Sequence, residues 1–484
     1  MATEPRKDGG ANRPWQVEAN GINRVPEALR NGRVQDLFWI WFAANIGILA
    51  VVYGAVIVAF GMNLWQGLLV IGLGAASFLL VGLFTVAGRD GGAPMMTLSR
   101  AVFGFYGNVL PNVVSWLSLV GWETIAVITG TLALMALFGQ MVAWPAALLA
   151  LAAMTVMLGF TIMAGLLGQA TLVVIQTWAS AIFGVLTLLV IVLLVPGTHW
   201  ASLAARPHGP WLTGFLPALT IVIAGTGLSW ANAAADYSRY LPRRVRAGPV
   251  VWATTLGGAI PLMVLMFTGM LLATHDPALA TSANPIAAIE SALPRWAAVP
   301  YLLTAAGGLV VEADLSLYSS GLNLLNMFVP WARYKTVLVD AAIMVAGTVY
   351  VVLVAQNFFG PFESFVVLLG IGLAAWAGVF AVHQLARRSG GDPYPDALLY
   401  GVAGARRAPP VRWAAVVAWA LGVAIGILFT SSPLFVGPWA TGVFAGSSLE
   451  VMVAFLVSAG VYAAWPKPAG PGAVRRPTPA RRAE

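Results

Sequence analysis

The feature that most constrains this chain is a series of about twelve apolar runs, each long enough to cross a bilayer as a helix, which takes roughly 20 residues. Hydrophobic residues make up 59% of the chain and charged residues only 9%, which is typical of polytopic membrane proteins. We therefore predict an all-α integral membrane protein. The runs lie near 36–61, 64–88, 106–138, 142–165, 169–196, 212–235, 248–273, 298–329, 336–358, 361–383, 411–431 and 439–466.

Basic residues gather on one side of the predicted membrane. If the spans alternate strictly, 24 of the 26 Lys and Arg residues share one side, and only Arg206 and Arg295 lie on the other. By the positive-inside rule, we expect a multi-pass protein of the cell inner (plasma) membrane with both termini in the cytoplasm. The net charge of +8 is then a topology signal, and we expect no nucleic-acid partner. The absence of cysteine excludes disulfides and thiolate metal sites.

The polar segments divide the chain. Residues 1–34 form a basic cytoplasmic leader that we expect to be mobile, and the run after it has no cleavage site, which indicates a retained first span. The loop between the second and third runs is too rich in glycine for a plain helix. Residues 411–466 are predicted to be accessory helices 11 and 12, and residues 467–484 a disordered cytoplasmic tail.

The sixth run is interrupted by small and polar residues. The stretch from Gly225 to Tyr240 contains two glycines, two serines, an asparagine and an aspartate, and lipid offers such groups no partner. This helix must therefore face protein or a water-filled cavity. Trp230 adds a flat aromatic surface beside a flexible backbone, which favours a site for a flat ligand. At its cytoplasmic end, Asp236 and Arg239 are spaced to pair on one helix face, as a structural or gating latch.

The first run carries Asn45 and Gly47 near its middle. Such a pair serves either in helix packing or in an unwound turn whose free carbonyls bind a cation. Both interpretations stay open from the residues alone.

Acidic residues at mid-depth mark two further runs. Glu123 follows Trp122 in the third run, and Glu312 begins a polar stripe in the eighth; a functional site is the first hypothesis for intramembrane carboxylates, with a packing role as the alternative. The stripe follows one helix face through Ser316, Ser319, Ser320 and Asn323. Asp314 lies about 200° around the helix from Glu312. Asp340 and Glu363 are expected at the membrane interface.

These features repeat at an interval of five spans. Spans 1 and 6 are interrupted, and spans 3 and 8 carry mid-depth acids. Because five is odd, the second set would run inverted through the membrane, and paired interrupted segments point to a transporter's central site. We predict one repeat at residues 35–196 and a second at residues 212–385.

Several motifs resemble those of the purine/cytosine permeases in nucleobase–cation symporter family 1. Trp230-Ala-Asn-Ala-Ala-Ala-Asp-Tyr-Ser-Arg-Tyr-Leu-Pro242 is similar to that family's W-x5-DYSRYLP signature. Gly92-Ala-Pro-Met-Met-Thr-Leu-Ser-Arg-Ala-Val-Phe-Gly-Phe-Tyr-Gly107 resembles its loop between helices 2 and 3. Gly121-Trp122 and Leu317-Tyr-Ser-Ser-Gly-Leu322 resemble its helix 3 and helix 8 motifs. Together the matches span about residues 35–330.

The resemblance implies a LeuT-like 5+5 inverted repeat plus two C-terminal helices. It also implies cation-driven uptake, with a heteroaromatic ring stacked between Trp122 and Trp230. Ala126 stands where the related hydantoin transporter has a ligand-binding Gln, which argues against hydantoin, and Ser320 falls near that transporter's helix 8 Asn. We expect Glu312 to supply polar recognition. The resulting candidate substrate residues are Trp122, Trp230, Glu123, Ala126, Gly227, Ser229, Glu312 and Ser320, and the family's sodium site corresponds to Ala44, Asn45, Gly47, Ser316 and Ser319.

The predicted function is a secondary transporter that imports cytosine or a purine-like planar heterocycle. The coupling ion is Na⁺ or H⁺, no cofactor is expected, and the oligomeric state is left open, with a monomer among the options. Alternatives are a carrier of allantoin, hydantoin, thiamine or uracil, or of an amino acid. A membrane enzyme is disfavoured, because the chain has no Cys and its four His lie in loops or at span ends. A channel is also disfavoured as the function; it would show flux without saturation.

Overall fold

The computed structural model describes residues 13–466 apart from 19, 278, 280, 281, 283, 356–358, 387–392, 402–408 and 433. Within that part the fold is helical, and the only β pairing is an isolated bridge between Ser431 and Val436. The helices are η1 (Glu27–Leu29), α1 (Val34–Ala44), α2 (Leu49–Ala59), α3 (Leu64–Ala76), α4 (Phe78–Gly91), α5 (Met95–Phe103), α6 (Val109–Met141), α7 (Ala146–Leu167), α8 (Gln169–Leu194), η2 (Val195–Gly197), α9 (Trp200–Ala205), η3 (Trp211–Phe215), α10 (Leu216–Gly225), α11 (Gly227–Ala231), α12 (Ala247–Leu272), α13 (Pro285–Ser291), α14 (Arg295–Asn326), α15 (Arg333–Val349), η5 (Tyr350–Ala355), α16 (Phe359–Leu385), α17 (Asp396–Tyr400), α18 (Trp413–Leu428), η6 (Gly442–Phe444) and α19 (Glu450–Ala464).

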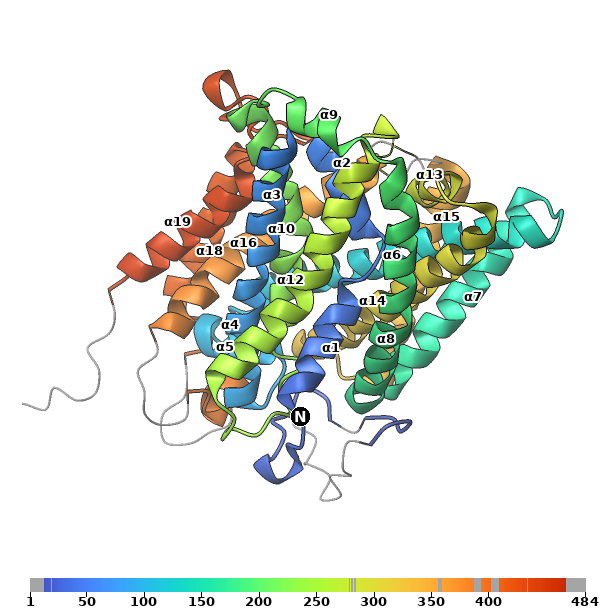
Figure 1. The fold of residues 1–484 in the computed structure, drawn as a ribbon. Coiled ribbons are helices and arrows are strands. Elements are labelled where there is room, and N and C mark those ends of the chain that lie inside the picture. Colours follow the sequence, from blue (N-terminus) through green and yellow to red (C-terminus); the bar gives the residue numbers. More distant parts are fainter. Residues whose placement is uncertain are drawn as a thin grey trace, which may run out of the picture.

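The helices agree with the predicted spans. The described residues contain nine helices long and apolar enough to cross a membrane, or ten if α1 and α2 count as one bent span, and α18 and α19 are shorter apolar helices at predicted spans 11 and 12. In Figure 1, α18 and α19 lie at one edge of the bundle beside α16, and α7 lies at the opposite edge. The centre is formed by α6 and α14, which pack together along much of their length, while α12 packs on α1, α2 and α4.

Two of the spans are broken, as predicted. The first bends by 58° between α1 and α2, where Asn45 to Ile48 leave the helix. The Asn45 side chain donates to Trp41 O at 2.8 Å, so it satisfies one carbonyl of the last turn of α1. The sixth span breaks between α10 and α11 at Thr226, whose φ of −122° and ψ of −104° are not helical. Both breaks therefore expose backbone groups inside the bundle.

The leader does not behave as expected. Glu18 is buried, its backbone N–H donates to Leu167 O at 2.9 Å, and Trp15 N–H donates to the Thr171 hydroxyl at 2.8 Å. The prediction of a mobile leader is therefore wrong for the residues from 13 onward that the structure describes. Sequence composition missed this packing because the partners of the leader lie more than a hundred residues away.

The loop between the second and third spans also differs from expectation, because it contains the buried helix α5. Gly92 and Gly104, with positive φ of 65° and 86°, end α4 and α5 respectively. These glycines therefore terminate helices, and they do not prevent a helix from forming in the loop. Burial lowers the pKa of Arg100 to about 10. Its guanidinium donates to Asn326 O at 3.0 Å and Leu399 O at 3.1 Å, which ties α5 to the ends of α14 and α17.

One interfacial assignment was wrong. Asp340 is fully buried in α15, where it accepts hydrogen bonds from Ser320 and Trp116. The Glu363 side chain lies outside the described residues. Glu450, which no sequence pattern explained, is fully buried at the start of α19.

Close approach between α2 and α12 gives a test of the fold. A Cβ on Gly269 would collide with the Val51 carbonyl, whereas nothing lies within 4 Å of a Cβ on Gly248 of the same helix. We expect Gly269→Ala to lower the free energy of unfolding by roughly 1–3 kcal/mol through overpacking. Gly248→Ala should be neutral or stabilising, because alanine favours the helix by up to about 1 kcal/mol. Thermal unfolding in detergent measures both, and equal melting temperatures would contradict this packing.

Candidate functional site

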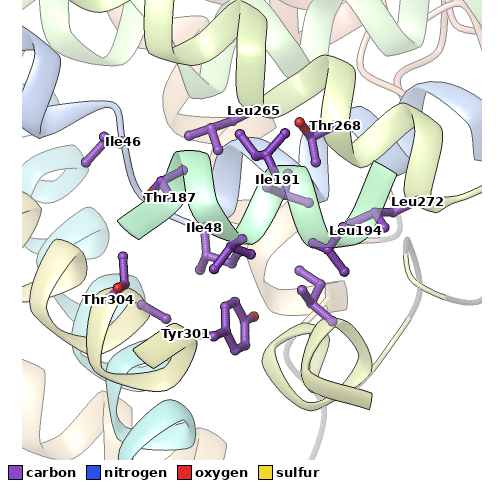
Figure 2. Close-up of a pocket in the computed structure, with 14 residues that line it drawn as sticks. Ile46, Ile48, Thr187, Ile191, Leu194, Leu265, Thr268, Leu272, Tyr301 and Thr304 are labelled. Atoms are coloured by element: carbon purple, nitrogen blue, oxygen red, sulfur yellow. The ribbon is translucent and has the colours of Figure 1, made fainter. Parts of the chain in front are cut away.

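A mainly apolar cavity with about 450 Å³ of empty volume lies beside the α1–α2 break, toward the end of the bundle opposite the N-terminus (Figure 2). Most of its hydroxyls are already engaged by backbone: Thr268 donates to Val264 O, Thr304 to Pro300 O and Tyr301 to Ile286 O. This cavity has few groups that could recognise a ligand's edge. Its lining is Ile46, Ile48, Val51, Thr187, Val190, Ile191, Leu194, Leu265, Thr268, Leu272, Ile289, Tyr301, Thr304 and Ala305.

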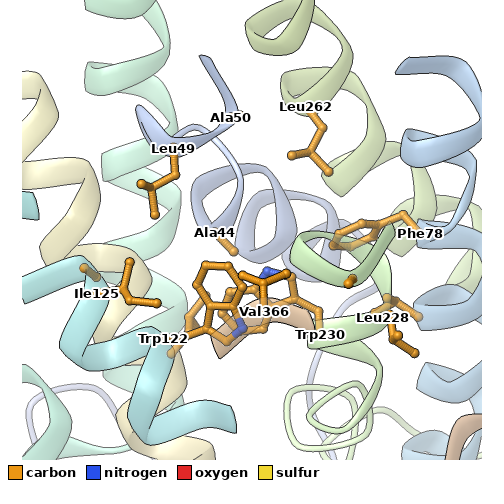
Figure 3. Packing of buried hydrophobic residues seen from close by; sticks show 14 of the residues in the cluster. Ala44, Leu49, Ala50, Phe78, Trp122, Ile125, Leu228, Trp230, Leu262 and Val366 are labelled. Carbon is orange, nitrogen blue, oxygen red and sulfur yellow. The ribbon is translucent and has the colours of Figure 1, made fainter. Parts of the chain in front are cut away.

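A second, more polar cavity lies where the two helix breaks meet α6 and α14. Its empty volume is about 290 Å³, and aromatic, carboxylate and unwound backbone groups surround it. Figure 3 shows Trp122 and Trp230 close together there, with Ala44, Leu49 and Leu262 around them. The lining is Ala44, Asn45, Gly47, Leu49, Ala50, Tyr53, Trp122, Gly225, Trp230, Leu262 and Glu312.

Each tryptophan is held by an edge-to-face contact with another ring. Trp230 packs on Trp41 with ring centroids 5.5 Å apart, and Trp122 packs on Phe365 at 5.6 Å. Such contacts fix the ring planes, and Trp122 and Trp230 are 7% and 6% exposed. The two indoles predicted from the sequence therefore line one cavity, although they lie on α6 and α11, more than a hundred residues apart.

Glu312 reaches the first helix break. A Cβ on Gly47 would lie 2.7 Å from the Glu312 Oε2 atom, so the missing side chain at Gly47 lets the carboxylate approach the unwound backbone. The hydroxyl of Tyr53 in α2 donates to Gly225 O at 3.3 Å and so connects the first break with the second. We did not predict Tyr53. Its depth in the first span could have marked it as a site residue, because tyrosine in a spanning helix is usually found at the membrane interface.

Five predicted substrate residues do not line this cavity. Gly227 packs on the junction of α3 and α4, where a Cβ would lie 2.6 Å from Ser77 O, and the Ser229 hydroxyl donates to Thr226 O at 3.0 Å. Ala126 is fully buried. Glu123 and Ser320 are also fully buried, and they face each other and Asp340.

Some of the candidate cation residues likewise line this cavity and others do not. Ala44, Asn45 and Gly47 line the cavity. The Ser316 hydroxyl is buried without a hydrogen-bond partner among the described residues, whereas the Ser319 hydroxyl lies 2.9 Å from that of Tyr237. No group of three or more His, Asp or Glu suited to a metal ion occurs in the described part of the chain. A cation here would depend on carbonyl and hydroxyl oxygens.

Asp236 and Arg239 do not form the expected ion pair. The chain after α11 continues in turns, where Asp236 accepts from Met95 N–H at 2.7 Å. Burial raises the pKa of Asp236 to about 7, against the opposing effects of that hydrogen bond and of Arg239. Arg239 instead pairs with Glu18 of the leader at 2.5 Å and donates to Tyr318 at 2.8 Å. Tyr240 joins this network by donating to Glu18.

Comparison with known proteins identifies the family. A family profile described as "Permease for cytosine/purines, uracil, thiamine, allantoin" matches residues 24–453. The chain belongs to this family. A putative purine-cytosine permease of Bacillus subtilis, YxlA, is 26% identical over 459 residues, which cover 94% of this chain and 96% of the relative. The purine-cytosine permease fcyB of Emericella nidulans is 25% identical over 450 residues, covering 87% and 83%. This protein is therefore a membrane permease and not an enzyme.

Solved structures show the same fold. Mhp1, a nucleobase-cation-symport-1 family transporter in a closed conformation with bromovinylhydantoin bound, has a TM-score of 0.67 at 17% identity, and the match covers 93% of each chain. A Na⁺-coupled sialic acid symporter has a TM-score of 0.61 at 11% identity, covering 93% of this chain and 92% of that one. The predicted all-α transporter fold is confirmed, while the boundaries of the two repeats stay a prediction.

The leader network gives a second test. Removing one partner of a buried ion pair costs roughly 3–5 kcal/mol, so Glu18→Gln should release the leader from Arg239. We expect trypsin cleavage after Arg24 to become at least tenfold faster, since about 1.4 kcal/mol already changes a local opening constant tenfold.

Glu27→Gln is the matched control, because the Glu27 side chain is 52% exposed and water can replace its contact with the buried Arg30. Its cleavage rate should stay near that of the wild-type chain. Equal acceleration in both variants would mean that burial of Glu18 does not hold the leader.

Proposed function

We propose that this permease is a secondary active transporter that imports a nucleobase, either cytosine or a purine-like planar heterocycle, by cation symport. The observation that carries the proposal is the meeting of two tryptophans and one carboxylate at a cavity between two broken helices. The names of the relatives support it, because several of them are purine-cytosine permeases. Rocking of one helix set against the other would open the site to each side in turn.

Recognition of the substrate combines stacking on aromatic rings with hydrogen bonds at the edge of the substrate ring. Stacking on Trp122 and Trp230 binds any flat ring, at about 1–3 kcal/mol per contact. Glu312 then accepts hydrogen bonds from ring N–H or exocyclic amino groups, which cytosine and adenine present. A ligand without such donors would leave the carboxylate unpaired, at a cost of roughly 1–3 kcal/mol or more. The substrate is thus selected at its donor edge.

The same carboxylate disfavours an amino acid as substrate. The ligand's own carboxylate would enter a cavity that already holds Glu312, and like charges at short distance repel. Other heterocycles of the family description, namely uracil, thiamine and allantoin, stay alternatives that competition can separate.

The coupling cation is Na⁺ or H⁺, and we place Na⁺, as the first of these alternatives, beside the α1 break. Ala44, Asn45 and Gly47 would offer backbone carbonyls there, and Ser316 and Ser319 hydroxyls. The apolar cavity of Figure 2 would serve as the route from the outside, since Ile46 and Ile48 of the same break line it. With both termini in the cytoplasm, the network of Glu18 and Arg239 would then be the inner gate.

Uptake of radiolabelled cytosine into expressing cells tests the proposal. Unlabelled bases, hydantoin, allantoin, thiamine and amino acids serve as competitors, with and without sodium and at two pH values. Competition by aminated bases supports the proposal. Competition by amino acids alone would overturn it, as would the absence of saturable uptake.

Stacking predicts a graded response at Trp230. Trp230→Ala should raise the KM for uptake about 5- to 150-fold, which corresponds to the loss of 1–3 kcal/mol. Trp230→Phe should keep most of the affinity, because a phenyl ring preserves a π-face. Trp178→Ala, at a side chain that is 67% exposed on α8, should leave uptake unchanged. Equal losses in the Ala and Phe variants would contradict stacking.

Glu312 is tested by a substitution that keeps its shape. Glu312→Gln replaces an acceptor by an amide that presents N–H to the ligand's donors, so we expect the KM for cytosine to rise about tenfold or more, since hydrogen bonds to charged groups contribute roughly 1.5–3 kcal/mol. Asp314→Asn is the matched control, because Asp314 is a buried carboxyl of the same helix outside the cavity lining. An unchanged KM in Glu312→Gln would remove Glu312 from recognition.

A further inference from the structure

Three helices bring two carboxyl groups to one hydroxyl in the interior of the bundle. Glu123 of α6, Ser320 of α14 and Asp340 of α15 are all fully buried. The Ser320 hydroxyl lies 2.8 Å from Asp340 Oδ2, and Trp116 Nε1–H donates to Asp340 Oδ1 at 3.1 Å. Glu123 lies close enough to Ser320 and Asp340 to interact with both. This cluster is separate from the residues that line the ligand cavity.

The hydrogen bonds of the cluster are incomplete in one respect. Each Asp340 oxygen has a donor, whereas the one donor near Glu123 among the described residues is Ser320, whose hydroxyl proton Asp340 also uses. The single hydroxyl proton of Ser320 is within reach of Asp340 and of Leu317 O at 3.0 Å. A charged Glu123 would therefore be buried without a donor of its own, at a cost far above that of a neutral carboxyl.

No described cation offsets this charge. Glu123 interacts with Asp340 through charge and with Ser320 through a hydrogen bond, and its charge in turn affects Tyr237. Among the helices packed on α6, α7 has no ionisable residue, and the Glu363 side chain of α16 lies outside the described residues. The basic residues of α14, α15 and α16 lie in first or last turns, at Arg295, Arg333, Lys335 and His383.

We propose that Glu123 and Asp340 share one bound proton, and that this proton is the coupling ion of the symport. Two carboxylates at one site cannot both ionise cheaply, so one holds a proton. A protonated Glu123 donates to Ser320 Oγ, Ser320 donates to Asp340 Oδ2, and Trp116 donates to the remaining Asp340 oxygen. The proton enters from water on one side of the membrane and returns to water on the other, with no covalent change. This assignment rests on the proposed function.

The position of the pair suits coupling to the substrate. Glu123 is the residue after Trp122, so a shift of α6 that seats a ring on Trp122 also moves the carboxyl. Loss of the proton would leave two charges facing each other between α6 and α15. Tyr237, in the segment after α11, lies near Glu123, and its hydroxyl donates to Leu315 O of α14 at 2.7 Å. Binding of the proton and binding of the substrate ring thus involve the same helices.

Proteoliposomes carrying the full chain test the assignment with two readouts. The first is cytosine-dependent proton influx measured by an internal pH dye, together with accumulation of labelled cytosine driven by an inward proton gradient. The second is cytosine counterflow without any gradient, which needs binding and alternating access but no net proton movement. Glu123→Gln and Asp340→Asn keep the shape of the protonated groups and should fold.

We expect both variants to retain counterflow and to lose gradient-driven accumulation by about 5- to 150-fold, the usual range of coupling between two sites. Glu450→Gln removes another fully buried carboxyl, in α19 outside the two predicted repeats, and should keep both readouts. Proton influx that persists in Glu123→Gln and Asp340→Asn would overturn the assignment, as would accumulation driven by sodium alone.

Infrared difference spectroscopy on the same chains needs no transport. A protonated carboxyl band that persists at neutral pH in the wild-type chain should be lost in Glu123→Gln. Wild-type chains that show this band but neither uptake nor counterflow would refute the proposed function and leave the shared proton standing. A band unaffected by either substitution would refute the shared proton itself.

Discussion

The structure depends on how two interrupted helices satisfy their backbone inside a membrane. Unpaired carbonyl and N–H groups cost several kcal/mol each in lipid, so breaks in α1–α2 and α10–α11 are tolerated only where protein surrounds them. Here the two breaks face one another: Tyr53 of α2 donates to Gly225 at the second break, and Glu312 approaches Gly47 at the first. The polar groups that make the fold costly are thus the ones that line the cavity.

The sequence predicted what depends on local composition. Span positions, both helix breaks and the mid-depth polar residues follow from the cost of placing such groups in lipid, and the helices bear them out. It did not predict which polar groups meet, because partners such as Glu18 and Arg239 lie 221 residues apart. A spacing rule paired Arg239 with Asp236 on a helix that ends at Ala231. Resemblance placed Trp122 and Trp230 together, which periodicity alone could not do.

Glycine occurs where two helices approach closely or where a helix leaves space for a neighbouring polar group. At Gly47 it admits a carboxylate, at Gly227 it admits the Ser77 carbonyl, and at Gly269 it admits the Val51 carbonyl. These contacts lie at the α1 break, the α11 start and the α2–α12 crossing. The same elements carry the cavity, so small residues that favour close packing also fix the dimensions of the site.

The buried acids divide according to what surrounds them. Glu312 borders the cavity, whereas Glu123 and Asp340 are enclosed, and the polar groups that the described part of the chain sets beside them are one serine, one tyrosine and one indole. A carboxyl at the cavity suits recognition, because its hydrogen bonds complete only when a donor arrives. An enclosed pair suits a proton, because neutralisation is the cheapest way for a carboxyl to remain buried. In the proposed mechanism, recognition and coupling thus fall on neighbouring residues of one helix, Trp122 and Glu123, that face different surroundings.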